Sequence, residues 1–391
     1  MLSDLVFELA AIGISVTVIT GRYSYEDPSV TFSAKKSIDG VAIIRVNTTN
    51  FGRANLFGRS LDYLTFYISA FFCAVKHTSS RTLLVAKTDP PLLSVPMYVA
   101  SRIKGGRFVT WLQDLFPEVA AELGVPIGSG LVGRTIKLIR NWSLRNADKN
   151  IAIGRRMKSL LIENAVEANR IVEIHNWADE TQIVPINKNQ NELSQQWGFI
   201  TDTFVVGYSG NLGRAHDIET LLGAAKILND HDRVKFLFIG GGKLRSELDE
   251  KASAFNLNNI VCKPYQPRNL LPKSLAVPDI HWISLQPDLE GTIVPSKFYG
   301  AAAAGRPIFF IGDVKGEIAR LISEFDCGET FALGESQRLA DTIIEYAGNE
   351  QRLKQSSKNA RNMIEDKFSR QAAFTKWQQA IDDVMHRIEE S

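Results

Sequence analysis

The segment LEGTIVPSKFYG, residues 289–300, combines a carboxylate, a glycine and a lysine just before an alanine-rich run. A proline and a serine, which favour the start of a helix, come directly before Lys297, so we expect this lysine in the first helical turn. A cation there is unfavourable for the helix dipole by roughly 0.3–1 kcal/mol, and a bound anion would remove that penalty. Glu290 would accept hydrogen bonds from hydroxyl groups. The segment therefore predicts a site for a phosphorylated sugar, whereas the alternative is a surface Glu and a surface Lys on an ordinary loop.

Backbone groups of the same segment are expected to contribute to this site. The glycine after Glu290 permits an unusual backbone angle. If the helix begins near Pro295, the N–H groups just before it are free and can bind an anion. The residues to which we assign this binding role are Gly291, Thr292, Ile293, Val294 and Ser296.

A second candidate is YSGNLGRAHD, residues 208–217, which follows an apolar strand and ends where a helix should begin. Gly210 and Gly213 allow tight turning beside Asn211, and a helix start supplies free N–H donors. Arg214 adds a fork of donors that suits phosphate oxygens. The alternative is a plain strand–turn–helix connection with a solvated arginine.

Two further loops could line the same site. FIGGGKLRSEL, residues 238–248, brings bare backbone to a ligand at Gly240 and Gly241, but it is neither a G-x-G-x-x-G fingerprint nor a Walker motif. PYQP, residues 264–267, is a proline-stiffened loop whose Tyr265 and Gln266 could receive a flat base. A plain turn is the alternative for each.

These loops follow strands of a predicted parallel sheet in the second half of the chain. Short apolar runs alternate with helical ones, as in sheets covered on both faces. The expected strands are 204–209, 234–240, 260–264, 280–285 and 307–312, with helices over about 218–229 and 244–255. Ligands of such sheets bind at the carboxyl ends of the strands.

The first half repeats the pattern less clearly. The expected strands there are 14–20, 41–46, 82–87, 108–112, 149–153 and 171–175. The chain opens on a helix, residues 2–13, where a doubly wound domain would begin with a strand and a glycine turn; either that strand is missing or the true start lies upstream. The polar stretch 187–196 has no apolar period and predicts a linker. The expected division is 1–186, a linker at 187–200, 201–368 and a C-terminal helix at 369–391, which Ser369 is expected to cap.

Composition fits an ordinary globular protein of two domains, with 391 residues, 45% hydrophobic and 23% charged. The net charge of +2 gives no reason to expect nucleic acid as a partner. The three cysteines, far apart, predict neither a disulfide framework nor a metal site, which fits a reducing compartment. No secretory signal and no spanning helix is apparent, so we expect a cytoplasmic protein.

At these residues the sequence resembles the retaining GT-B glycosyltransferases of family 4, in the branch that builds bacterial surface polysaccharides. The matching segments, in chain order, are YSGNLGRAHD, FLFIGGG, PYQP, LEGTIVPSKFYG and AAAAGRPI. The resemblance implies an α/β fold of two doubly wound Rossmann-like domains with a cleft between them. It also implies transfer of a hexosyl group from a UDP-sugar, UDP-glucose or a related donor, with retention of configuration.

The resemblance also implies roles for single residues. Arg214 and Lys297 would neutralise the donor diphosphate without a metal, and no convincing DxD motif is present. Glu290 would contact the sugar hydroxyls. Asp114, in WLQDLFPE, would lie near the acceptor hydroxyl or the donor sugar.

Three departures from the family pattern stand out. The second glutamate of the family falls at Gly300, or at Phe298 without a gap, and the first-domain histidine falls near Gln113. The glycine turn after the first strand is absent.

A basic amphipathic segment, residues 130–149, could lie on an anionic membrane, helped by the apolar helix near 61–75. The alternative is a domain helix with a solvated basic face. Because members of the resembled branch often use lipid-linked acceptors, we expect a saccharide or lipid-linked acceptor and peripheral contact with the inner face of the membrane. Two other functions stay open: a UDP-sugar epimerase, and a sugar-nucleotide binding protein without catalysis.

Overall fold

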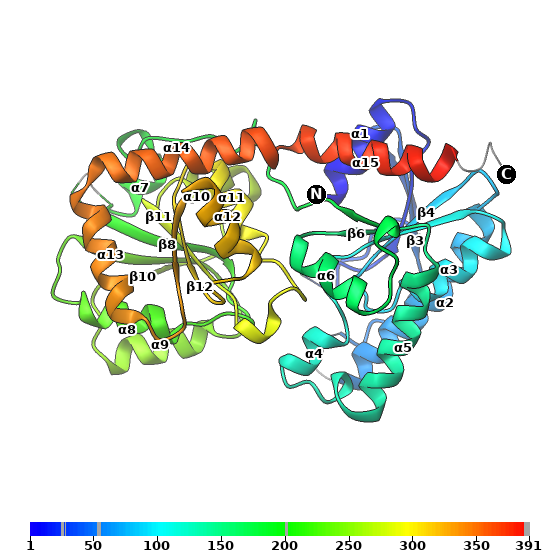
Figure 1. Ribbon diagram of the computed structural model, residues 1–391, viewed down its shortest axis with the longest axis horizontal. Helices are drawn as coiled ribbons and strands as arrows, with labels where there is room; N and C mark the ends of the chain where they lie inside the picture. The colour runs from blue at the N-terminus through cyan, green and yellow to red at the C-terminus, as the bar shows by residue number, and fades with distance from the viewer. Residues whose placement is uncertain (25–26, 28, 53–55, 200–201, 387–391) are drawn as a thin grey trace.

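The computed structural model describes residues 1–24, 27, 29–52, 56–199 and 202–386. The chain forms two α/β domains side by side, and two long C-terminal helices run across both of them (Figure 1). The mixed α/β class with parallel sheets is as predicted.

The second domain is built on one parallel sheet of six strands. The strands are β8 (Phe204–Asn211), β9 (Val234–Gly241), β10 (Ile260–Lys263), β11 (Ile280–Ser284), β12 (Ile308–Ile311) and β13 (Gly328–Phe331), in the spatial order β10-β9-β8-β11-β12-β13. The helices between them are α8 (Glu219–Ile227), α9 (Arg245–Ala254), α10 (Leu271–Leu275), α11 (Lys297–Ala303) and α12 (Glu317–Phe325), and α13 (Ser336–Gly348) follows β13. The strand order reverses between β8 and β11, which is where a doubly wound sheet offers a binding crevice.

The first domain contains two sheets among the described residues, rather than one. β1 (Thr17–Gly21), β2 (Lys35–Ile38) and β3 (Val41–Val46) form one, and β4 (Leu83–Lys87), β5 (Arg107–Trp111), β6 (Lys149–Ala152) and β7 (Ile171–Glu173) form the other. Its helices are α1 (Leu2–Ala11), α2 (Leu56–His77), α3 (Ser94–Ile103), α4 (Glu118–Glu122), α5 (Gly130–Asn146) and α6 (Arg155–Glu163). β1 and β4 are edge strands in the described part of the chain.

Two strands were not predicted. β2 is a polar run, and it pairs antiparallel with β3 through a two-residue turn in which Asp39 and Gly40 have φ of 46° and 81°. An Asp-Gly pair of this kind is a strong hairpin signal. β13 has only one buried apolar residue, Phe331, so it lacks an apolar run.

The stretch predicted as a linker is not extended. Lys188–Gln190 is a 3-10 helix and Glu192–Gln196 is helix α7, which the side chain of Asn191 caps by accepting from the Leu193 N–H at 3.1 Å. Leu193 and Phe199 are buried in a cluster with Val205 and Leu237 of the second domain. Two apolar residues are too few to show a period in sequence, yet they suffice to fix this stretch to the second domain.

The C-terminal segment returns to the first domain. α14 (Glu350–Lys367) covers the second domain, and α15 (Arg370–Met385) begins at Ser369, whose hydroxyl accepts from the Ala372 N–H at 3.2 Å, the cap predicted from sequence. In α15, Trp377 packs edge-on against Trp111 of β5 at 4.9 Å between ring centroids. The two helices therefore connect both domains along one side (Figure 1).

Candidate functional site

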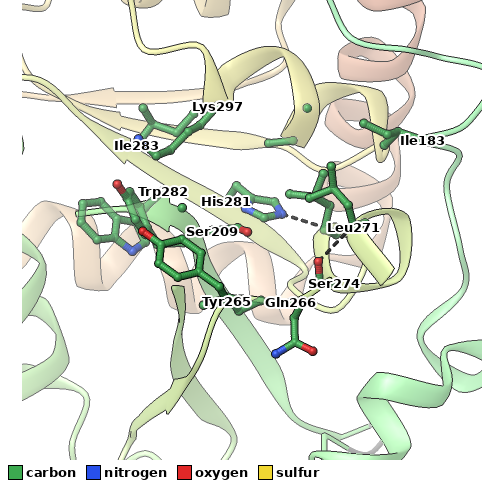
Figure 2. Close-up of a pocket in the computed structure, with 16 residues that line it drawn as sticks. Ile183, Ser209, Tyr265, Gln266, Leu271, Ser274, His281, Trp282, Ile283 and Lys297 are labelled. Atoms are coloured by element: carbon green, nitrogen blue, oxygen red, sulfur yellow. Dashed lines mark hydrogen bonds between the residues drawn. The ribbon is translucent and has the colours of Figure 1, made fainter. Parts of the chain in front are cut away.

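A cavity of about 260 Å³ lies at the carboxyl ends of β8, β9 and β11, at the reversal of strand order. Figure 2 shows Lys297, Ser209 and Tyr265 around this opening. The predicted residues that line it are Gly210, Tyr265, Gln266 and Lys297, together with Gly300, the position of a noted departure. Parallel topology thus brings together residues from three of the predicted segments.

Lys297 lies in the first turn of α11, as predicted, although the helix begins at this residue rather than near Pro295, and its side chain is turned into the cavity. Its ammonium nitrogen lies 3.4 Å from Nε2 of His216 and 5.3 Å from the centre of the Tyr208 ring. None of the ion pairs found among the described residues involves Lys297. Burial without a carboxylate lowers the pKa of Lys297 to about 8. The site therefore holds a buried cation without a counter-ion, which favours an anionic ligand.

His216 supports this lysine, and sequence reasoning assigned it no role. Its Nδ1 lies 2.7 Å from the carbonyl oxygen of Ser284. Because a carbonyl only accepts, Nδ1 carries the hydrogen and Nε2 is left as the acceptor that faces Lys297. Burial, followed by the nearby charge of Lys297, lowers the pKa of His216 to about 4, so the ring is neutral at pH 7.

Glycine is required where β8 ends. Gly210 has φ of 134°, and a Cβ there would come within 2.6 Å of Cε of Lys297. At β9, a Cβ on Gly240 or Gly241 would meet the Tyr265 ring at 3.0 or 3.2 Å. The side chains of Lys297 and Tyr265 thus pack directly against the glycine backbone at the ends of β8 and β9.

The other predicted residues form a second group, at the contact between the domains. Glu290 does not line the cavity: its Oε1 accepts from the backbone N–H of Glu317 at 2.8 Å, at the start of α12. Gly291, with φ of 78°, faces α6, where a Cβ would lie 2.9 Å from Leu160. The pKa of Glu290 is raised, first by burial.

The free N–H groups predicted just before α11 are only partly present. Residues 287–289 form a 3-10 turn, and the carbonyl of Leu289 accepts from Thr292 at 3.0 Å and from Ile293 at 3.4 Å. The expectation was wrong for these two N–H groups because the local turn uses them. Val294 is buried, and Ser296 caps α11 without a side-chain hydrogen bond.

Asp114 of the first domain meets this loop. It forms an isolated antiparallel bridge with Ile293, and the Leu115 N–H donates to the carbonyl of Thr292 at 2.9 Å. Burial raises the pKa of Asp114 to about 6. A carboxyl group that titrates near neutral pH therefore lies where the two domains touch.

The remaining predicted residues lie outside the cavity. Arg214 is exposed in the turn after β8. Asn211, the last residue of β8, is exposed too, and its carbonyl accepts from the Tyr208 hydroxyl at 2.6 Å. A Cβ placed on Gly213 would lie 3.5 Å from Nδ2 of Asn211, which is an ordinary contact distance. None of these three residues is among those that line the cavity.

Across the described residues, no group of three or more His, Cys, Asp and Glu side chains is arranged to hold a metal ion. In the same part of the chain, no helix has both the length and the hydropathy needed to span a bilayer.

Comparison with known proteins matches both halves of the chain. Residues 1–177 match the glycosyl transferase 4-like domain, and residues 189–363 match the glycosyl transferases group 1 family. The chain is 28% identical over 267 residues to a probable glycosyltransferase, WbjE, of Pseudomonas aeruginosa, covering 66% of this chain and 65% of WbjE. It is 26% identical over 273 residues to WcaI of Escherichia coli K12, a putative colanic acid biosynthesis glycosyl transferase, covering 68% and 66%. The match thus spans just under two thirds of each relative.

Solved structures share the fold. HepE of Anabaena in complex with UDP superposes with a TM-score of 0.69 at 16% identity, covering 88% of this chain and 87% of that one. The complex of HepE with UDP-glucose gives a TM-score of 0.68 at 17% identity, covering 89% and 87%. Two family models that together span both domains, curated relatives of the same kind and this two-domain architecture agree: the chain belongs to the GT-B glycosyltransferases of family 4.

Proposed function

We propose that the protein transfers a hexosyl group from a UDP-sugar, UDP-glucose or a related donor, to a growing saccharide or lipid-linked acceptor of a surface polysaccharide. The observation that carries the proposal is the buried ammonium of Lys297, which has no counter-ion in the part of the chain that the structure describes and is turned into a cavity at the reversal of strand order. A diphosphate supplies the missing negative charge. The UDP and UDP-glucose complexes of HepE, a protein of the same fold, support the choice of donor.

The lining of the cavity suggests how a nucleotide would lie. The exposed ring of Tyr265, with Gln266 beside it, offers a surface for the base, close to the bare backbone of Gly240 and Gly241. The diphosphate would lie at Lys297 and Gly210. The sugar would then extend toward Glu290 and Gly291, because one loop carries both Glu290 and Lys297.

In the proposed reaction, the bond between the anomeric carbon and the diphosphate oxygen breaks while the acceptor oxygen bonds to that carbon on the same face. The acceptor proton passes to the departing phosphate, and UDP leaves. Negative charge grows on the diphosphate as the bond breaks, so a fixed ammonium stabilises the transition state more than the bound donor. We propose that Lys297 provides this charge and that no metal ion is required.

The second group of residues would complete the site when a donor and an acceptor bind. We assign the sugar hydroxyls to Glu290 and the acceptor side to Asp114, whose pKa of about 6 suits a group that accepts a hydrogen bond from a hydroxyl. Arg214 is exposed in the turn after β8, so it would have to swing inward to reach the diphosphate.

We also propose the division of labour between the domains. Residues 1–186 would receive the acceptor at the cytoplasmic face of the membrane, and the second domain would hold the donor. Because the segment from residue 188 to Phe199 packs against the second domain, we propose that this domain starts at about residue 188 rather than at residue 201.

A UDP-sugar epimerase is the alternative within the same fold. It would need additional acids or bases that face the donor sugar. His281 lines the cavity, but it is buried, and its Nε2 lies 2.8 Å from the carbonyl of Leu275. Its pKa is lowered by burial to about 4. This histidine is therefore neutral and held by the backbone, which disfavours the epimerase.

The test is incubation with UDP-glucose and a lipid-extract acceptor, with the product analysed by NMR for its anomeric configuration. Transfer with retention supports the proposal, interconversion of UDP-sugars would replace it with the epimerase, and binding without turnover would leave a binding protein. A panel of nucleotide sugars in thermal shift identifies the donor, since the best ligand raises the melting temperature most.

A further inference from the structure

Helix α6 of the first domain receives its N-terminal cap from the second domain. α6 begins after Gly154, which has no side chain that could accept a hydrogen bond from the first turn. Oε2 of Glu317, the first residue of α12, accepts instead from the backbone N–H of Arg156 at 3.1 Å. The first N–H groups of a helix have no partner within it, so this carboxylate satisfies one of them and complements the helix dipole. α6 lies on the side of the first domain that faces the second (Figure 1).

The contact between Gly154 and Glu317 is close. A Cβ on Gly154 would lie 3.0 Å from both Cδ and Oε2 of Glu317. The φ of Gly154 is −179°, an extended backbone that any residue adopts, so a side chain there would crowd the carboxylate without straining the backbone. The absence of a side chain at residue 154 thus makes room for the carboxylate of the other domain.

The carboxylate of Glu317 is buried and charged, with only 1% of the side chain exposed. Burial by itself would raise the pKa of Glu317, but contacts with His175, Arg320 and the Arg156 N–H outweigh it and lower the pKa to about 2. Arg320 belongs to α12 and pairs with Oε1 at 2.5 Å, whereas His175 belongs to the first domain and its Nε2 lies 3.5 Å from the same oxygen. Separation of the domains would therefore leave Glu317 only the partner from its own helix.

Glu317 is also joined to the loop of residues 289–296. Its backbone N–H donates to Oε1 of Glu290 at 2.8 Å, so Glu290 caps α12 just as Glu317 caps α6. The same loop touches α6 directly, because a Cβ on Gly291 would lie 3.3 Å from Cβ of Arg156. Two carboxylates in series thus connect Glu290 to α12 and α12 to the first domain. The position of Glu290 relative to Asp114 of that domain therefore depends on Glu317.

We propose that Glu317 is a positioning residue for the transfer reaction: it holds the first domain against the loop of Glu290, so that Glu290 and Asp114 face one reaction centre. The inference rests on the proposed function for the reaction that it serves, whereas the contact between the domains does not. Neither Glu317 nor Gly154 lines the cavity into which Lys297 is turned. Binding of UDP and positioning of the domains should therefore be separable by mutation.

Two changes at Glu317 test the cap. Glu317→Ala removes the acceptor and should lower kcat at least about tenfold, the equivalent of one hydrogen bond to a charged group. Loss of an interaction that serves only turnover leaves substrate binding intact, so the Kd for UDP and the KM for the donor should stay within about twofold of wild type. Glu317→Gln keeps an oxygen that can accept from the Arg156 N–H, and it should recover kcat to within about threefold of wild type. Transfer rates with UDP-glucose and calorimetry with UDP provide the measurements.

A change in the first domain reaches the same contact from the other side. Gly154→Ala leaves Glu317 in place and crowds its carboxylate, so it should lower kcat by at least about threefold with UDP affinity unchanged. Because this variant removes no buried group, it tests the contact even if Glu317→Ala does not fold. The matched control is Gly348→Ala at the end of α13, where a Cβ meets nothing within 4 Å, and it should behave as wild type.

Small-angle X-ray scattering without substrate tests the contact independently of the proposed function. The radius of gyration should be larger in Glu317→Ala and Gly154→Ala than in wild type and Gly348→Ala, whether or not the chain transfers sugar. Wild-type scattering from both Glu317→Ala and Gly154→Ala would overturn the inference. A UDP affinity that falls as far as kcat would overturn it too, because Glu317 would then only support the second domain. Wild-type protein without transfer activity would instead refute the proposed function, and the scattering would still decide whether Glu317 holds the domains together.

Discussion

The ammonium nitrogen of Lys297 lies 3.4 Å from Nε2 of His216, a neutral imidazole whose Nδ1–H is held by the carbonyl of Ser284. The two residues are 81 positions apart in sequence. A carboxylate at this place would cancel the charge of the lysine, whereas a neutral acceptor fixes its position and leaves the full charge for a ligand.

A prediction for His216 follows. His216→Gln keeps a neutral acceptor and should retain UDP affinity within about threefold, whereas His216→Phe removes it and should lower affinity by about tenfold, the equivalent of one hydrogen bond to a charged group. His216→Asp, which pairs with the lysine, should lower affinity at least as much as the Phe variant. Calorimetry with UDP checks all three, with circular dichroism as the control for folding. Equal affinities in the Gln, Phe and Asp variants would show that His216 does not position Lys297.

Removing the cation itself should have a larger effect. Lys297→Ala should lower kcat by about 10²–10³-fold, or about 2.7–4 kcal/mol, as for the loss of a donor that stabilises transition-state charge. Arg214→Ala tests whether this exposed arginine swings inward. A comparable decrease in kcat would show that Arg214 reaches the diphosphate. Steady-state transfer rates with UDP-glucose provide the measurement. Full activity of Lys297→Ala would refute the assignment on which the proposed function depends.

The lowered pKa of Lys297 predicts how UDP binding depends on pH. The free protein has a lysine pKa of about 8. A bound diphosphate favours the charged lysine, so binding raises this pKa. Below about pH 7 the lysine is almost fully charged, and affinity should be nearly constant. As the pH rises through 8 affinity should fall, and binding should take up a proton. Calorimetry in two buffers of different ionisation heat measures that uptake. Lys297→Met should lose both the pH dependence and the proton uptake.

Substitution by alanine should have different effects at two nearby glycines, Gly210 in β8 and Gly213 in the turn that follows. Gly210→Ala places a Cβ 2.6 Å from Cε of Lys297 at a φ of 134°, so the lysine has to move and UDP affinity should fall by at least about tenfold. Gly213→Ala meets its nearest atom only at 3.5 Å, and it should be tolerated. Thermal shift with and without UDP distinguishes a loss of binding from a loss of stability. Similar behaviour of both variants would contradict the close approach at Gly210.

Glu290 should affect both stability and turnover. Its carboxylate accepts from the Glu317 N–H at the start of α12, so Glu290→Ala should lower the free energy of unfolding by about 1 kcal/mol. Glu290→Gln keeps an oxygen acceptor and should be close to wild type in stability, yet it should transfer sugar more slowly if this carboxylate contacts the donor. Denaturant unfolding and transfer rates are measured on the same preparations. An active, stable Gln variant would restrict Glu290 to the helix cap.

Activity should not require a divalent cation, because Lys297 is proposed to supply the positive charge. Protein dialysed against chelator should keep its transfer rate within about twofold, and added Mn²⁺ should not raise it. The comparison variant is Lys297→Ala: a metal-dependent recovery in that variant alone would show an ion taking the place of the ammonium. A wild-type rate that vanishes with chelator and returns with Mn²⁺ would end the metal-independent proposal.

The sequence predicted features that neighbouring residues determine. The buried strands of the second domain, the helix start at Lys297 and the cap at Ser369 all depend on local patterns of apolar, proline and serine residues, and each is present. The prediction failed where a backbone N–H could either stay free for a ligand or bond within a local turn. The N–H groups of Thr292 and Ile293 donate to the carbonyl of Leu289 and are therefore not free.

Contacts between distant segments could not be read from the sequence. His216 stood within a quoted motif, but its partner Lys297 is brought to it only by the pairing of β8 with β11. The separation of Glu290 from the cavity likewise depends on α12, which begins 27 residues later.

The chain passes between the domains twice, before α7 and between α14 and α15, and the two passages are joined to each other. Arg361 donates to the carbonyls of Glu180 at 2.8 Å and Ile183 at 2.7 Å, and Arg370 pairs with Asp179 at 3.1 Å. Two interdomain connections that are bonded to each other in this way form one hinge rather than two independent linkers. An opening of the two domains would then rotate them about this hinge, and the side of the domain contact farthest from the hinge would move most.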